Sequence, residues 1–210
     1  MSEIVGSFEI NENLVRSLVH EQHPDFAGLD LCVVADGWDN QLWPLADELA
    51  VRMPRTERAP SLLRKEHQWL PALTPRLPLP VPTPLRIGEP SARFPRPWTI
   101  ATWVPGEPAD RAPISNDSAA DTLADEAVAA PDGEDPPVWL HGDLHPAHVV
   151  VSDGALAGVI DFGDMCAGDP AVDLAAARVL GPTRHRLRGS DNRRPTSWRA
   201  DCSSSVKPRQ

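Results

Sequence analysis

Residues 141–148 read His-Gly-Asp-Leu-His-Pro-Ala-His, and residues 161–164 read Asp-Phe-Gly-Asp. Each stretch follows a short apolar run that predicts a strand, at 138–140 before the first and at 156–160 before the second. Polar loops that follow two such strands can bring their side chains into one pocket. The pattern therefore predicts a site that contains the carboxylates of Asp143 and Asp161.

Two carboxylates of this kind suit one particular chemistry, although each string alone could be an ordinary polar loop. Transfer of a phosphoryl group from ATP needs a carboxylate that orients an attacking hydroxyl and accepts its proton. It also needs a second carboxylate that holds magnesium against the phosphates. The order of Asp143 and Asp161 along the chain fits these two roles.

The two stretches, together with Gly158–Ile160 before Asp161 and Gly168–Leu174 after it, resemble the paired signatures of the aminoglycoside phosphotransferase family. The resemblance implies an α+β, protein-kinase-like fold of two lobes. The N-terminal lobe would hold an antiparallel sheet, and the C-terminal lobe would be truncated and mainly helical. ATP and Mg²⁺ are the implied cofactors, and the implied substrate is a hydroxyl of a small molecule, aminoglycoside-like or other. The resemblance makes Asp143 the catalytic base and Asp161 a magnesium ligand.

The first half of the chain resembles the nucleotide-binding half of such kinases more loosely. In those enzymes a loop between two strands covers the phosphates of the nucleotide. A positively charged side chain on a strand binds these phosphates, and a glutamate on a helix orients that side chain. Here the cation would be Arg52 and the glutamate Glu66, although each could also be a solvated residue. The loop would be Asp36–Asn40, which has one glycine and could also be a plain hairpin turn. Its candidate nucleotide-binding residues are Gly37, Trp38, Asp39 and Asn40.

The first of three departures from the family concerns the metal site. His148 stands where the family usually has an asparagine that helps to hold magnesium, so the implied metal residues are Asp161 and His148. Magnesium prefers oxygen ligands and seldom uses imidazole, which predicts a weakened or water-mediated contact there. The other departures are the short interval between Gly106 and His141, and the basic, polar segment after Leu180.

These departures leave two alternative functions open. One is a catalytically impaired, kinase-like remnant that binds nucleotide weakly or not at all. The other is a metal-dependent hydrolase in which three imidazoles and a carboxylate bind Zn²⁺ or Mn²⁺. Its ligands would be His141, Asp143, His145 and His148. We rank the hydrolase last because Gly142 and Pro146 interrupt any regular strand or helix.

The other elements are predicted from periodicity and from turn residues. Helices are expected at 9–20, 59–73, 119–130 and 170–180, the last with Asp169 and Asp173 as capping residues. Strands are expected at 29–35, 41–45 and 49–53 as an antiparallel meander, and again at 98–104, 138–140, 149–151 and 156–160. The proline-rich stretch 71–97 is expected to cross between elements as extended chain.

The 210 residues carry a net charge of -10, which disfavours nucleic acid and membranes as partners because both reward clustered cations. The first residues lack the basic and apolar regions of a signal peptide, so we expect a cytoplasmic protein. Four regions are expected along the chain. They are a nucleotide-binding lobe at 1–104, a hinge and acidic connector at 105–136, a catalytic and metal-binding part at 137–180, and a basic, disordered tail at 181–210.

Overall fold

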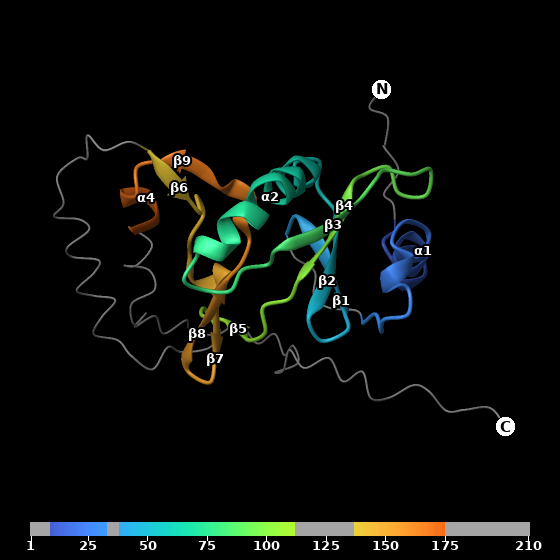
Figure 1. Cartoon of the computed structure of the whole chain (residues 1–210), viewed down its shortest axis with the longest axis horizontal. Coiled ribbons are helices and arrows are strands. Elements are labelled where there is room, and N and C mark those ends of the chain that lie inside the picture. Colours follow the sequence, from blue (N-terminus) through green and yellow to red (C-terminus); the bar gives the residue numbers. More distant parts are fainter. Residues whose placement is uncertain (1–8, 33–37, 112–136, 175–210) are drawn as a thin grey trace, which may run out of the picture. The chain divides into compact units, whose positions relative to one another are not determined.

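The computed structural model describes residues 9–32, 38–111 and 137–174 (Figure 1). These residues form two compact units, each made from separate stretches of chain. The first unit takes 9–32, 38–73 and 83–103, and the second takes 74–82, 104–111 and 137–174. The helix expected at 119–130, most of the one expected at 170–180, Gly37 and the basic segment after 180 lie outside the described residues. Among the helices that are described, none has the length and apolar character to cross a membrane.

The first unit is built on one antiparallel sheet. Its strands are β1 (Asn40–Leu45), β2 (Leu49–Pro54), β3 (Pro84–Gly88) and β4 (Trp98–Thr102). Their order across the sheet is β1-β2-β4-β3. The hairpin of β1 and β2 is confirmed, with Leu45 opposite Leu49 and Ala46 in the left-handed region at φ 53°.

Of the strand expected at 29–35, residues 33–35 lie outside the described residues, and residues 29–32 make only an isolated bridge between Leu31 and Leu45. The N–H of Cys32 donates to the carbonyl of Pro44 at 3.0 Å. In an antiparallel ladder Pro44 would return this bond, but proline has no N–H to donate. The pair of Cys32 and Pro44 therefore has one hydrogen bond in place of two.

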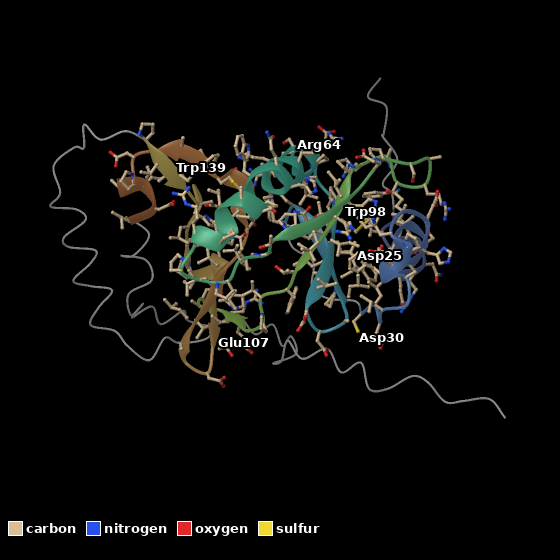
Figure 2. All side chains as sticks on the ribbon, viewed as in Figure 1. Asp25, Asp30, Arg64, Trp98, Glu107 and Trp139 are labelled. Atoms are coloured by element: carbon tan, nitrogen blue, oxygen red, sulfur yellow. The ribbon has the colours of Figure 1, made fainter. Side chains whose placement is uncertain are left out.

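α1 (Glu12–Gln22) covers one face of the sheet (Figure 1). It begins after Asn11, whose side-chain oxygen accepts a hydrogen bond of 3.0 Å from the N–H of Leu14, as an N-cap residue does. The buried stripe of α1 is Val15, Leu18 and Val19. Its core partners on the sheet are Trp43, Leu45, Val51, Met53, Ile100 and Trp98, the last of which is labelled in Figure 2.

α2 (Ala59–Leu73) covers the opposite face of the sheet and confirms the helix predicted there. Its fully buried side chains include Leu63, Glu66 and Leu70. Side chains alternate along β2, so Val51 and Met53 join the α1 core while Arg52 points towards α2. This alternation places a cation under the helix. The chain then leaves through a 3-10 turn, η2 (Thr74–Arg76).

β3 corrects the prediction that residues 71–97 are only extended crossing chain. Gly88 lies opposite Trp98, and a Cβ at Gly88 would overlap the indole ring, so only glycine lets this ring close over the strand. Pro84 begins β3 at the edge of the sheet, where a residue without an N–H costs no ladder hydrogen bond. The strand was hidden because prolines usually argue against one.

The second unit contains two small antiparallel sheets. One orders β5 (Glu107–Pro108), β7 (Val149–Ser152) and β8 (Ala155–Val159), and the other pairs β6 (Val138–Leu140) with β9 (Cys166–Gly168). Its helical elements are η3 (Pro146–His148), η4 (Phe162–Asp164) and α4 (Ala171–Leu174). Asp153 and Gly154, at φ 52° and 76°, make the predicted tight turn between β7 and β8. The N–H of Val159 donates to the carbonyl of Pro80 at 3.0 Å, which attaches residues 74–82 to this unit.

Half-buried His23 gives the first unit a testable pH dependence. Its ring stands edge-on to Trp98 with centroids 5.3 Å apart, and its Nε2 donates to the carbonyl of Ile87 at 3.1 Å. Burial lowers the pKa of His23 below the ordinary value of about 6.5. The stabilisation that follows is fully present above about pH 6.5 and is lost as the pH falls through the lowered pKa, because the unfolded chain then binds more protons.

Urea unfolding between about pH 8 and about pH 5 measures this contribution. Wild-type protein should lose more unfolding free energy over that range than His23→Gln does, because glutamine does not titrate. Equal losses in the two proteins would contradict the prediction.

Candidate active site

The loop after β6 is fixed at its first residues. Asp173 of α4 accepts hydrogen bonds from the N–H of His141 at 2.5 Å and from the N–H of Gly142 at 3.0 Å. Gly142 has a φ of 84°, and a Cβ there would overlap the carbonyl oxygen of Asp164 in η4. Only glycine therefore allows this loop to approach the η4 turn so closely.

His141 joins the same two loops through both of its ring nitrogens. Its Nε2 donates to the carbonyl of Ile160 at 2.9 Å, and its Nδ1 accepts from the N–H of Asp143 at 3.3 Å. The ring also packs 4.6 Å from that of Phe162. Burial lowers the pKa of His141, which favours the neutral ring that can donate and accept at once. Both nitrogens are thus engaged by the protein itself, and the hydrolase hypothesis, which counts His141 as a metal ligand, stays a prediction.

Asp161 follows β8 in an unusual backbone conformation. Its φ of 65° and ψ of 63° lie in the left-handed region, which aspartate tolerates better than most residues but which still costs energy. Backbone strain of this kind concentrates at functional sites. The conformation turns the chain into η4 and supports a functional role for this residue.

The structure brings Asp143, His148 and Asp161 together. Nδ1 of His148 lies 3.8 Å from Oδ2 of Asp143, and Nε2 of the same ring lies 3.4 Å from Oδ2 of Asp161. The His148 side chain is 15% exposed, whereas those of Asp143 and Asp161 are 52% and 50% exposed. The two carboxylates thus face one largely buried ring and remain open to a ligand.

His145 packs against the ring of His148, with centroids 3.8 Å apart. Its Nδ1 accepts a hydrogen bond from the N–H of Ala147 at 3.3 Å, which caps η3. Its Nε2 lies 4.0 Å from Oδ2 of Asp143. His145 therefore braces the turn that carries His148.

In the first unit, Arg52 and Glu66 form the pair that the sequence predicts. Nη1 of Arg52 donates to Oε2 of Glu66, and Nη2 donates to Oε1 at 3.3 Å. Arg52 is 8% exposed and Glu66 only 1% exposed. A carboxylate that accepts two parallel hydrogen bonds fixes the plane of a guanidinium, so Glu66 orients Arg52.

The described part of the predicted phosphate loop begins at Trp38, whose side chain is almost fully exposed. The Asp39 carboxylate pairs with Nη2 of Arg58 at 2.6 Å, and the hydrogen bond from Arg58 lowers the pKa of Asp39. Asn40 begins β1 and is buried; its Oδ1 has no hydrogen-bond partner in the described part of the chain. The Asp39 carboxylate is thus engaged by the protein itself.

Asp173 is the residue of the site that the sequence analysis missed. It was expected to cap a helix, as Asp169 does by accepting from the N–H of Ala171 at 2.9 Å. Asp173 instead holds the loop that carries Asp143. Its partners lie 31 and 32 positions earlier in the chain, so no local pattern could reveal them.

Asp173→Asn should lower the free energy of unfolding by about 1.5–3 kcal/mol, because an amide replaces one of the two charged acceptors with a donor. Urea unfolding measures the loss. Asp169→Asn is the matched control and should leave stability unchanged, because asparagine caps helices as well as aspartate does. Equal stability of the two variants would contradict the anchoring role of Asp173.

Comparison with known proteins gives family and structural relatives. The profile of the phosphotransferase enzyme family matches residues 30–130 and 119–202. The GDP complex of wild-type aminoglycoside 2'-phosphotransferase-IIIa is similar, with a TM-score of 0.65 and 19% identity over 82% of this chain and 79% of that one. Macrolide 2'-phosphotransferase MphH from Brachybacterium faecium has a TM-score of 0.53 and 19% identity over 81% and 78%. A streptomycin-ATP-APH(2'')-IIa ternary complex has a TM-score of 0.51 and 14% identity over 79% and 75%. No curated protein matches.

The structural likeness confirms the α+β, protein-kinase-like fold, with an antiparallel-sheet N-terminal lobe and a truncated C-terminal lobe. The described part of the C-terminal lobe holds few helical residues, in α4 and the 3-10 turns. The two segments that the family profile matches cover well over half of the sequence. The chain therefore belongs to the phosphotransferase enzyme family.

Proposed function

We propose that this chain is an ATP-dependent phosphotransferase that acts on a hydroxyl of a small molecule. The observation that carries the proposal is the placement of two half-exposed carboxylates, Asp143 and Asp161, against the single ring of His148. Membership of the phosphotransferase enzyme family supports it. So do the contents of the similar structures, which include GDP in one case and ATP with streptomycin in another.

Asp143 is the proposed catalytic base. Its carboxylate orients the acceptor hydroxyl and takes the proton of that hydroxyl as the new bond to phosphorus forms. The main chain around it is held, because Nδ1 of His148 donates to the carbonyl of Asp143 at 2.8 Å and His141 accepts from its N–H. A base held in this way loses little entropy when the acceptor arrives.

Arg52 is the proposed ligand of the nucleotide phosphates. A guanidinium has five N–H donors, so Arg52 can keep its two bonds to Glu66 and still donate to phosphate oxygens. The Asp39 carboxylate is already bound by Arg58. Asp39 would therefore contact the nucleotide through its main chain. The other proposed contacts of the phosphate loop are Gly37, Trp38 and Asn40.

Asp161 and His148 are the proposed metal residues, and their donor atoms do not fit Mg²⁺ well. Asp161 supplies carboxylate oxygen, which Mg²⁺ prefers, but His148 supplies imidazole nitrogen where an oxygen is needed. The donor atoms of Asp161 and His148 therefore do not fit the Mg²⁺ that the family resemblance implies. The two donors suit a cation that accepts nitrogen as well as oxygen.

The proposal is tested by transfer of the γ-phosphate from labelled ATP to a panel of hydroxyl compounds that includes aminoglycosides and macrolides, with Mg²⁺ and with Mn²⁺. We expect a labelled product with at least one acceptor. Calorimetry with ATP, run in parallel, separates the enzyme from the impaired remnant. Nucleotide binding without transfer to any acceptor would favour the remnant, and the absence of both would overturn the proposal.

A further inference from the structure

We propose that Nε2 of His148 and the carboxylate of Asp161 form a binding site for a divalent transition-metal cation, and that this site prefers such a cation to Mg²⁺. The inference deepens the proposed function, and rests on it in taking this cation as the one that accompanies ATP. It is carried by the hydrogen bonds and spacing of the His148 ring.

The His148 ring donates a hydrogen bond to the main chain through Nδ1. Nδ1 lies 2.8 Å from the carbonyl oxygen of Asp143. A carbonyl oxygen can only accept, so Nδ1 carries a proton and donates it. In the neutral ring the lone pair then lies on Nε2. A histidine that donates one N–H to a backbone carbonyl and keeps the other nitrogen free is the usual form of a metal-binding histidine.

Nε2 of His148 faces the carboxylate of Asp161. It lies 3.4 Å from Oδ2 of Asp161, so a nitrogen lone pair and a carboxylate oxygen are close neighbours. Two donors that bind one ion at about 2.1 Å lie roughly 3.0–3.4 Å apart at octahedral or tetrahedral angles. The observed separation falls in that range. The two side chains are therefore spaced as ligands of one ion.

A second group of candidate ligands lies beside this pair. Candidate ligand atoms of Asp143, His145 and His148 lie within 4.8 Å of one another. However, Nδ1 of His145 accepts from the N–H of Ala147, so its proton is on Nε2, the atom that faces Asp143. Binding through that atom would move the proton of His145 to Nδ1 and break the cap. The pair of His148 and Asp161 needs no such loss.

The donor atoms of His148 and Asp161 determine which cation the site prefers. Imidazole binds divalent transition metals readily but is a poor ligand for Mg²⁺, which demands oxygen and gives up its water reluctantly. One nitrogen and one carboxylate oxygen suit Mn²⁺, Co²⁺ or Zn²⁺. His148→Asn would replace the nitrogen donor with an amide oxygen, so this variant should lose the preference.

Mn²⁺ is the probe for the test, which uses the full chain. Binding is followed by loss of the free Mn²⁺ signal in electron paramagnetic resonance, with Mg²⁺ as the competitor. Pulsed measurements report whether ¹⁴N is bonded to the ion, and labelling with [¹⁵N]histidine identifies the nitrogen as imidazole. Wild-type protein should show histidine nitrogen bonded to Mn²⁺ and bind Mn²⁺ at least about tenfold more tightly than Mg²⁺.

Two variants locate the ligand. His148→Asn should lose the nitrogen coupling and about tenfold of the preference for Mn²⁺, while His145→Gln should keep both. Circular dichroism confirms that each variant is folded. Loss of the coupling in His145→Gln with its retention in His148→Asn would overturn the assignment. Absence of the coupling in wild-type protein, or equal binding of Mg²⁺ and Mn²⁺, would overturn it as well.

The outcomes also separate this inference from the proposed function. If the protein transfers phosphate but its bound Mn²⁺ shows no histidine nitrogen, the proposed metal site is wrong and the proposed phosphotransferase function stands. If Mn²⁺ is bound by histidine but the protein transfers phosphate to no acceptor, the metal site stands and the proposed phosphotransferase function is contradicted.

Discussion

Asp143→Asn should lower the rate of phosphoryl transfer by about 100- to 10,000-fold, because an amide keeps the shape of the carboxylate but cannot take a proton. Nucleotide affinity should change little, since Asp143 is assigned to the acceptor hydroxyl and not to ATP. The measurement is kcat with the best acceptor of the panel, together with calorimetry of ATP binding. The split between a large fall in kcat and a small change in binding is the signature of a base.

Asp153→Asn is the matched control for this experiment. Asp153 lies in the turn between β7 and β8 at φ 52°, a conformation that asparagine also tolerates. This control should retain wild-type turnover. Unchanged turnover in Asp143→Asn would refute the assignment of the base, and equal losses in both variants would point to unfolding instead.

Glu66→Gln should lower the free energy of unfolding by about 3–5 kcal/mol, because it removes the charge that faces the buried guanidinium of Arg52 through two parallel hydrogen bonds. Both residues are less than a tenth exposed. The pair joins β2 to α2, so the loss falls on the contact between the sheet and this helix. Urea unfolding of the full chain measures it.

Two further variants make the stability prediction specific. Glu57→Gln removes an equal charge from an exposed position just before α2 and should change stability by less than about 0.5 kcal/mol. The double variant Arg52→Met with Glu66→Leu should recover most of the loss, because an apolar pair of similar volume has no unpaired charge. A full-sized loss in the double variant would show that the ion pair is not the cause.

The parts of the fold that the sequence predicted are those specified by neighbouring residues. Apolar spacing predicted α2, and the dipeptide Asp153-Gly154 predicted the turn that its backbone angles require. β3 was missed because proline is a local signal against strands, whereas its position at a sheet edge is a property of the whole sheet. The described residues of the strand expected at 29–35 form only a bridge, and the donor that is missing opposite them, that of Pro44, belongs to another strand.

The candidate site divides in the same way. Local motifs placed Asp143 and Asp161 on neighbouring loops, and the structure brings both against His148. The pairing of Arg52 with Glu66 followed from the family resemblance, since a strand and a helix carry no local signal for each other. Asp173 was invisible because its bonds to the loop depend on how α4 returns to β6.

The interleaving of the two units along the chain has a consequence for synthesis on the ribosome. Residues 74–82 belong to the second unit, yet residues 83–103, which complete the sheet of the first, emerge after them. The nascent Pro80 must wait for Val159, about 80 residues later, which takes roughly 4–16 s at the usual rates of elongation. During that interval residues 74–82 lack the hydrogen bond that attaches them to the second unit.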